Sequence, residues 1–144
     1  MSQTIRNIKD LTLATDKYIY YVVDKVGIMI KEKIDEFIRY YYNEYDPYRY
    51  QRTYNFLNSC VKTTPRKIKG GYEVEVYIDT SITYSNGWTM AQTANYANHS
   101  LHGDIRVSDM EFWDDAVEEI NEGKILVGAF VQFMNDKGIK LIYK

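Results

Sequence analysis

Apolar side chains recur every three or four positions through the first third of the chain. This stripe runs from Ile19 to Tyr41 and predicts an amphipathic helix, because residues at that spacing share one helix face. We expect the helix to span about Leu13 to Asn43, which corresponds to about 45 Å at 1.5 Å per residue. A domain of this size does not need so long a helix, so part of it is expected to project or to pack on a neighbouring subunit.

The period of the pattern changes after this helix. Pro47 pushes the residue before it out of the α region and so ends the helix. A short second helix is predicted over Tyr48–Asn58. Residues 60–80 predict a hairpin, since apolar and polar positions alternate over Tyr72–Ile78 and Gly70–Gly71 supplies the turn.

Two further helices are predicted in the last third of the chain. Ser108 and Glu111 have the S-x-x-E spacing of a capping box, and they predict a helix over about 109–121. Gly123 is a suitable C-terminal stop for that helix. A second apolar stripe predicts the last helix, over about 124–137.

The remaining segments carry weaker signals. Residues 82–106 predict a loop, within which Trp88–Tyr96 has the composition of a short helix, and Ile139–Tyr143 has the composition of a strand. Together the segments predict a single α+β domain over 1–144. In it, a long N-terminal amphipathic helix and shorter helices pack on a small antiparallel sheet.

Composition excludes several classes of protein. The chain is 45% hydrophobic and 26% charged, with a net charge of −2, which is ordinary for a globular domain. The longest apolar runs, Tyr18–Val23 and Ile125–Val131, are far shorter than the roughly 20 residues of a membrane helix. Cys60 is the single cysteine, so an intrachain disulfide is excluded. Tyrosine is unusually frequent, with 15 copies.

The charge is divided between the two halves of the chain. Residues 1–71 carry a net charge of +5 and residues 72–144 carry −7. One interpretation is that the basic part of one copy pairs with the acidic part of the next, a head-to-tail arrangement that closes into rings. The other is that both halves mix their charges over one surface.

Candidate chemical groups are few, and we expect no catalytic, cofactor or metal site. Glu111, Asp115 and Glu118 share a helix face, but acids near a helix N-terminus are also stabilising without a cation. His99 and His102 are three residues apart, with Asp104 as the nearest further ligand, whereas zinc needs three or four. If these acids did hold a cation, the chain could be a metal-dependent enzyme, and this is one hypothesis for its function.

The segment 39–54 concentrates tyrosine and arginine. Such a segment can stack bases and hold phosphates, can form a protein interface, or can pack within the chain. All three interpretations stay open at this level. The candidate interface residues are Tyr42, Tyr45, Tyr48, Arg49, Tyr50, Arg52 and Tyr54.

The same segment resembles a motif of tailed-phage head–tail connector proteins, also called neck or tail-completion proteins. In that family a long helix ends in a tyrosine-rich stretch of the form Y-x-P-x-x-Y-x-R-T-x-x-L-x-x-S, which is similar to Tyr45–Ser59 here. Leu101–Gly103, Phe112–Ala116 and Asp136–Ile139 occupy the places of later family signatures. Phe56 and Leu57 share the usual aliphatic position, and residues 81–98 match poorly.

The resemblance implies a structural protein of the virion, assembled in the host cytoplasm. Several copies, six in many relatives, would form a ring between the portal or its adaptor and the tail, and DNA would pass through without sequence-specific binding. The alternative is a small cytoplasmic protein that binds single-stranded nucleic acid through the tyrosine- and arginine-rich segment. Neither hypothesis requires a cofactor or a membrane.

Overall fold

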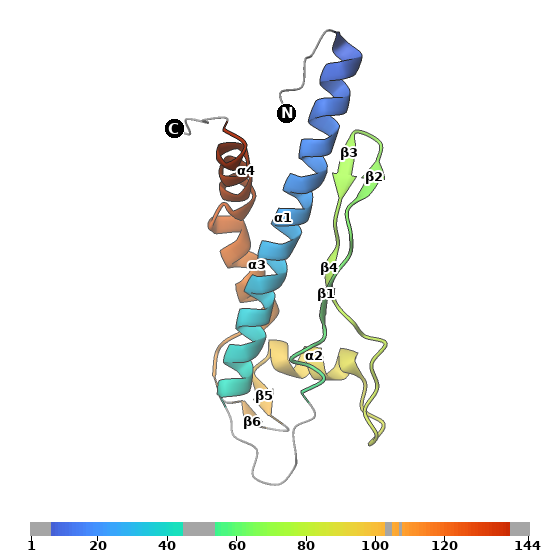
Figure 1. The fold of residues 1–144 in the computed structure, drawn as a ribbon. Coiled ribbons are helices and arrows are strands. Elements are labelled where there is room, and N and C mark those ends of the chain that lie inside the picture. The colour runs from blue at the N-terminus through green and yellow to red at the C-terminus, as the bar shows by residue number, and fades with distance from the viewer. Residues whose placement is uncertain (1–6, 45–53, 103–104, 107, 139–144) are drawn as a thin grey trace.

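One long helix organises the protein (Figure 1). The computed structural model describes residues 7–44, 54–102, 105–106 and 108–138. Helix α1 spans Ile8–Asn43, 36 residues, or about 54 Å. It begins five residues before the predicted start, at Leu13, and ends at the predicted residue. The predicted α+β class, with a long first helix and small antiparallel sheets, is confirmed.

A long hairpin lies along one side of α1. Strands β1 (Cys60–Lys62) and β4 (Val76–Ile78) pair antiparallel near its base, and β2 (Arg66–Ile68) and β3 (Gly71–Glu73) pair near its tip. The two ladders are separated at Pro65, which has no N–H to donate. Gly70 makes the turn with a φ of +94°, which glycine adopts readily.

The short helix predicted over Tyr48–Asn58 is wrong where the structure describes it. Residues 55–58 form turns, Tyr54 has no regular structure, and residues 48–53 lie outside the described part of the chain. The backbone of Tyr54 is left-handed, with a φ of +59°, which interrupts a right-handed helix. The Ser59 hydroxyl then donates to the Phe56 carbonyl oxygen at 2.6 Å and closes the turn.

Within the loop predicted over 82–106, the short helix expected at Trp88–Tyr96 is present two residues later in the chain, whereas the loop after it is wrong in part. Helix α2 spans Met90–Asn98, and strands β5 (Leu101–His102) and β6 (Ile105–Arg106) form a small antiparallel pair after it. Thr89 begins the helix with a capping box, because its hydroxyl accepts from the Gln92 N–H while the Gln92 side chain accepts from the Thr89 N–H.

Helices α3 (Phe112–Glu122) and α4 (Ile125–Asp136) complete the fold. The predicted capping box at Ser108 and Glu111 is wrong, since Glu111 is the N-cap and its side chain makes no capping hydrogen bond. The Asn98 side-chain oxygen accepts instead from the N–H groups of Trp113 and Asp114, at 3.0 and 3.4 Å. Gly123 ends α3 as predicted, and the strand predicted over Ile139–Tyr143 lies outside the described residues.

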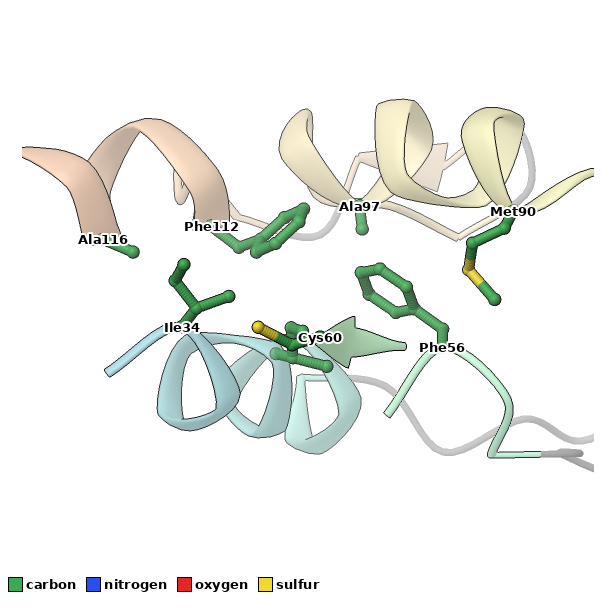
Figure 2. Packing of buried hydrophobic residues seen from close by; sticks show 8 residues of the cluster. Ile34, Phe56, Cys60, Met90, Ala97, Phe112 and Ala116 are labelled. Carbon is green, nitrogen blue, oxygen red and sulfur yellow. The ribbon is translucent and has the colours of Figure 1, made fainter. Parts of the chain in front are cut away.

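The core lies around the C-terminal half of α1. Figure 2 shows apolar side chains from α1, the turn at Phe56, β1, α2 and α3 pointing toward one another. The Phe56 and Phe112 rings meet edge to face, with centroids 5.4 Å apart. The buried cluster consists of Ile34, Ile38, Phe56, Cys60, Met90, Ala97, Phe112 and Ala116.

The hairpin is held on α1 by one close contact and by polar contacts. A Cβ added at Gly27 would lie 2.9 Å from Val74 Cγ2, so the hairpin approaches the helix closely at this glycine. Toward the hairpin tip, the Tyr72 hydroxyl donates to Asp16 at 2.7 Å and the Lys67 ammonium lies 3.2 Å from the same carboxylate. These two contacts, with that of Tyr72 the larger, lower the pKa of Asp16.

We expect Gly27→Ala to destabilise the protein although alanine favours a helix. The new methyl group meets Val74, and overpacking of this kind costs about 1–3 kcal/mol, against a propensity gain of about 1 kcal/mol. Urea unfolding measures the difference. The double variant Gly27→Ala/Val74→Ala should recover part of the loss, and Gly128→Ala in α4, where the added Cβ meets open space, should not destabilise. Equal midpoints for Gly27→Ala and the wild type would contradict the close packing.

Candidate functional site

The structure describes two of the seven predicted interface residues, Tyr42 and Tyr54. The Tyr42 ring lies nearly parallel to the Tyr54 ring, with centroids 5.8 Å apart, and to the Phe56 ring, at 6.1 Å. Tyr42 is half-buried, whereas Tyr54 is 49% exposed. The stack therefore extends from the core to the surface. Five predicted residues lie outside the described residues: Tyr45, Tyr48, Arg49, Tyr50 and Arg52.

The neighbouring Tyr41 ties the end of α1 to strand β5. Its ring stacks on the His102 imidazole, with centroids 4.3 Å apart and planes 10° from parallel. Its hydroxyl donates to the Leu101 carbonyl oxygen at 2.8 Å. Sequence reasoning placed Tyr41 on the apolar stripe but missed this contact, because Tyr41 and Leu101 are 60 positions apart in the sequence and no local pattern connects them.

A polar network continues from this point. The Ser108 hydroxyl donates to the Glu44 carboxylate at 2.6 Å and accepts from the Met110 N–H at 3.1 Å. The Ser100 oxygen lies 2.9 Å from the Ser108 oxygen, and the Ser100 hydroxyl donates to the Met110 carbonyl oxygen. Ser100 is fully buried and has a left-handed backbone, with a φ of +49°. The network fixes the segment before α3 against the end of α1.

The two histidines have different surroundings. The side chain of His102 is 4% exposed, and its Nε2 lies 3.9 Å from the Glu44 carboxylate. The side chain of His99 is 51% exposed, and its Nδ1 lies 4.0 Å from Glu111. Asp104, the further ligand considered from the sequence, lies outside the described residues. Across the described ranges, no three His, Cys, Asp or Glu side chains gather in a way that could hold a metal ion.

The acidic residues of α3 serve several local contacts. Asp115 accepts from the Glu111 N–H at 3.0 Å, and Glu119 pairs with Lys33 of α1 at 2.8 Å. Both Glu119 and Glu36 raise the pKa of Lys33. Glu118 and Glu122 are exposed. Of the predicted set Glu111, Asp115 and Glu118, the first two are thus joined by a hydrogen bond at the start of the helix.

Cys60 is buried in the core, with 4% of its surface exposed. Desolvation, with a smaller contribution from Asp35, raises the pKa of its thiol to about 11. The thiol is therefore protonated at neutral pH, and a protonated thiol is a poor nucleophile. This environment is that of a packing residue.

The described residues define an α+β protein built along one helix, with an aromatic and polar cluster at the C-terminal end of that helix. The family model YomN matches residues 7–136, and the chain belongs to the YomN family. This membership indicates a phage-associated protein. Neither the comparison with curated proteins nor the comparison with solved structures gave a match. In the described part of the chain, no helix combines the length and apolarity needed to cross a membrane.

We predict that Ser108→Ala destabilises the protein by about 1–3 kcal/mol, because the variant removes a donor from a carboxylate that is largely shielded from water. Ser85→Ala, at an exposed position, should change the free energy of unfolding by less than about 0.5 kcal/mol. Urea denaturation of the two variants measures this. If both unfold at the wild-type midpoint, the Ser108 network is not a source of stability.

The Cys60 thiol should not react with a disulfide reagent at pH 8 in the native protein and should react fully in guanidinium. Because burial raises its pKa from 9.0 to about 11, its contribution to stability is complete below pH 9. That contribution is lost as the pH rises from 9 to about 11. A Cys60→Ala variant, which lacks this titration, is the control for the alkaline limb. Rapid native labelling would contradict the burial.

Proposed function

We propose that the chain is a structural protein of a tailed-phage virion, a head–tail connector, neck or tail-completion subunit. Several copies would form a ring that joins the portal side of the capsid to the tail. Its partners would be further copies of itself, a portal or adaptor protein, and tail proteins. Its role in this proposal is structural and not enzymatic, and DNA passes through the ring without sequence-specific recognition.

The observation that carries the proposal is the incomplete burial of α1. Val26, Ile34 and Ile38 on its inner face are buried, whereas large apolar side chains elsewhere on the helix are exposed. We interpret these exposed side chains as surface that other proteins of the particle cover. Among the α1 side chains that the structure describes, the exposed large apolar ones are Leu13, Tyr18, Ile19, Tyr21, Ile28 and Tyr40.

Two further findings support the proposal. Membership of the YomN family indicates a phage-associated protein. The order of elements, a long helix, a hairpin and two closing helices, is also the order that the resemblance to connector proteins implies. The second candidate, binding of single-stranded nucleic acid, depends on Arg49 and Arg52, which lie outside the described residues.

The proposal is tested in the phage that encodes the chain. A nonsense mutation in the gene should abolish plaque formation, and lysates should contain DNA-filled heads and separate tails. Expression of the wild-type chain from a plasmid should restore joined particles. Electron microscopy of the lysates measures the outcome, and joined, infectious particles from the mutant would overturn the connector function.

Binding to nucleic acid separates the two candidates. The purified chain should not bind single-stranded DNA more tightly at low than at moderate salt. If it did, and if Arg49→Ala/Arg52→Ala weakened that binding, the nucleic-acid hypothesis would be favoured instead.

A further inference from the structure

We propose that copies of this chain bind one another head to tail, with the hairpin of one copy on helices α3 and α4 of the next. The inference rests on the proposed function, because a ring requires two different and complementary surfaces on each copy. The proposal identifies these two surfaces as one on the hairpin and one on helices α3 and α4. Figure 1 shows the hairpin and α4 on opposite sides of α1, so the two surfaces do not overlap.

The outer surface of α4 is apolar and uncovered. Ala129 is buried and Phe133 packs against the rings of Tyr18 and Tyr21 of α1, with centroids 6.0 and 6.3 Å apart. Away from these contacts, Val127 is 37% and Phe130 is 42% exposed. A helix with apolar residues all round is normally buried on all sides. In a single copy of the chain, other elements cover only one side of α4.

Gly128 marks the place of closest approach. It lies in the interior of α4, where glycine is among the least favourable residues. A Cβ added there meets no atom within 4 Å, so packing within the chain does not require the glycine. Gly27 shows the contrast, because the hairpin fills the space beside it. Val127, Gly128 and Val131 line a hollow on the outside of α4, and Lys124, Gln132, Asn135 and Asp136 contribute polar groups to it.

The helix that leads into α4 adds negative charge to this side. Helix α3 contains five acidic residues and no basic one. Glu119 is paired with Lys33, whereas Glu118 and Glu122 are exposed, and Val117 beside them is 37% exposed. We call the surface formed by Val117, Glu118, Glu122, Val127, Gly128 and Phe130 the helical face.

The hairpin presents matching groups on the other side of α1. Its tip carries Arg66, Lys67 and Lys69 around Ile68, which is 41% exposed. Arg66 pairs with Glu73 and Glu75 but keeps 69% of its side-chain surface exposed. Lys67 lies on the opposite face of the strand, toward α1, where it pairs with Asp16. Tyr77, at the base, is 43% exposed. We call Arg66, Ile68, Lys69 and Tyr77 the hairpin face.

The two faces therefore complement each other in charge and in apolar character. A basic, apolar tip fits an acidic, apolar helical surface, and like faces repel, which disfavours a symmetric pair. A contact between two different faces leaves one of each free, so copies continue to add until a ring closes. The partner inferred for each face is thus a second copy of this chain.

Two blocked variants test the assignment. Gly128→Trp fills the hollow on the helical face, and Ile68→Glu/Lys69→Glu reverses the hairpin tip; all three positions are exposed, so the fold should survive. Native mass spectrometry should find each variant monomeric, with at least a tenfold higher concentration required for any assembly. An equimolar mixture should give one-to-one dimers and nothing larger. The intact hairpin face of Gly128→Trp can bind the intact helical face of Ile68→Glu/Lys69→Glu, and the two blocked faces prevent any further contact.

Controls separate a failed assignment from a failed fold or function. Ala91→Trp, at an exposed position of α2, should assemble like the wild type. Gly128→Ala should raise the melting temperature of the monomer and weaken assembly at the same time, a pair of opposite effects that a misfolded variant would not show. Circular dichroism confirms that each variant is folded.

The outcomes are distinct. If both blocked variants assemble like the wild type, or if their mixture stays monomeric, the assigned faces are wrong. A wild-type chain that stays monomeric at all concentrations also overturns the contact. Neither result decides the connector function, which the complementation of the nonsense mutant judges independently.

Discussion

The structure depends on the packing of Phe56 and Phe112 against one short stretch of α1. Their rings meet at the centre of a cluster to which α1, the turn after it, β1, α2 and α3 each contribute. Helices as short as α2 and α3 are only marginally stable on their own, since most helical stability in proteins comes from tertiary packing. The positions of α2 and α3 therefore follow from these two side chains and from Ile34 and Ile38 beneath them.

The position of this core explains why the rest of α1 is exposed. Of the buried apolar residues in the described ranges, Val26, Gly27, Pro65 and Ala129 lie outside the cluster. The N-terminal half of α1 is flanked by the hairpin and α4 but is not enclosed by them. A small core gives a small margin of stability, and binding of the folded state to partners adds to that margin. The small core thus accounts both for the exposed side chains of α1 and for a stability that binding to a partner would increase.

Hydrophobic periodicity was sufficient to predict the elements that bury one face. Helix α1, the hairpin and the last two helices all have a clear repeat, and their bounds were predicted to within a few residues. The side chains that cap the helix ends are harder to predict from the sequence. Ser108 has the sequence of a cap but bonds to Glu44, while Asn98 of α2 caps α3 from 15 residues away. A local pattern cannot distinguish these cases, because both depend on which segment the fold brings nearby.

The candidate site shows the same limit. The tyrosine excess is visible in the composition, yet two of the contacts that use it to hold the fold together join residues far apart in the sequence. Tyr41 reaches Leu101 and Tyr72 reaches Asp16, in each case through a hydroxyl at the end of an apolar ring. Leucine in these positions would contribute to the core and make no polar contact beyond it.

Tyrosine suits a protein that has a narrow core and whose surfaces are expected to bind other protein subunits. Its ring contributes to packing while its hydroxyl is satisfied at the edge of the core, so the side chain spans both environments. The stack from Phe56 through Tyr42 to the exposed Tyr54 is such a span. A partner that covers Tyr54 would extend an aromatic stack that already reaches the core. The same side chains can therefore stabilise one copy and serve in its contacts, and packing and interface are not exclusive interpretations of the tyrosine excess.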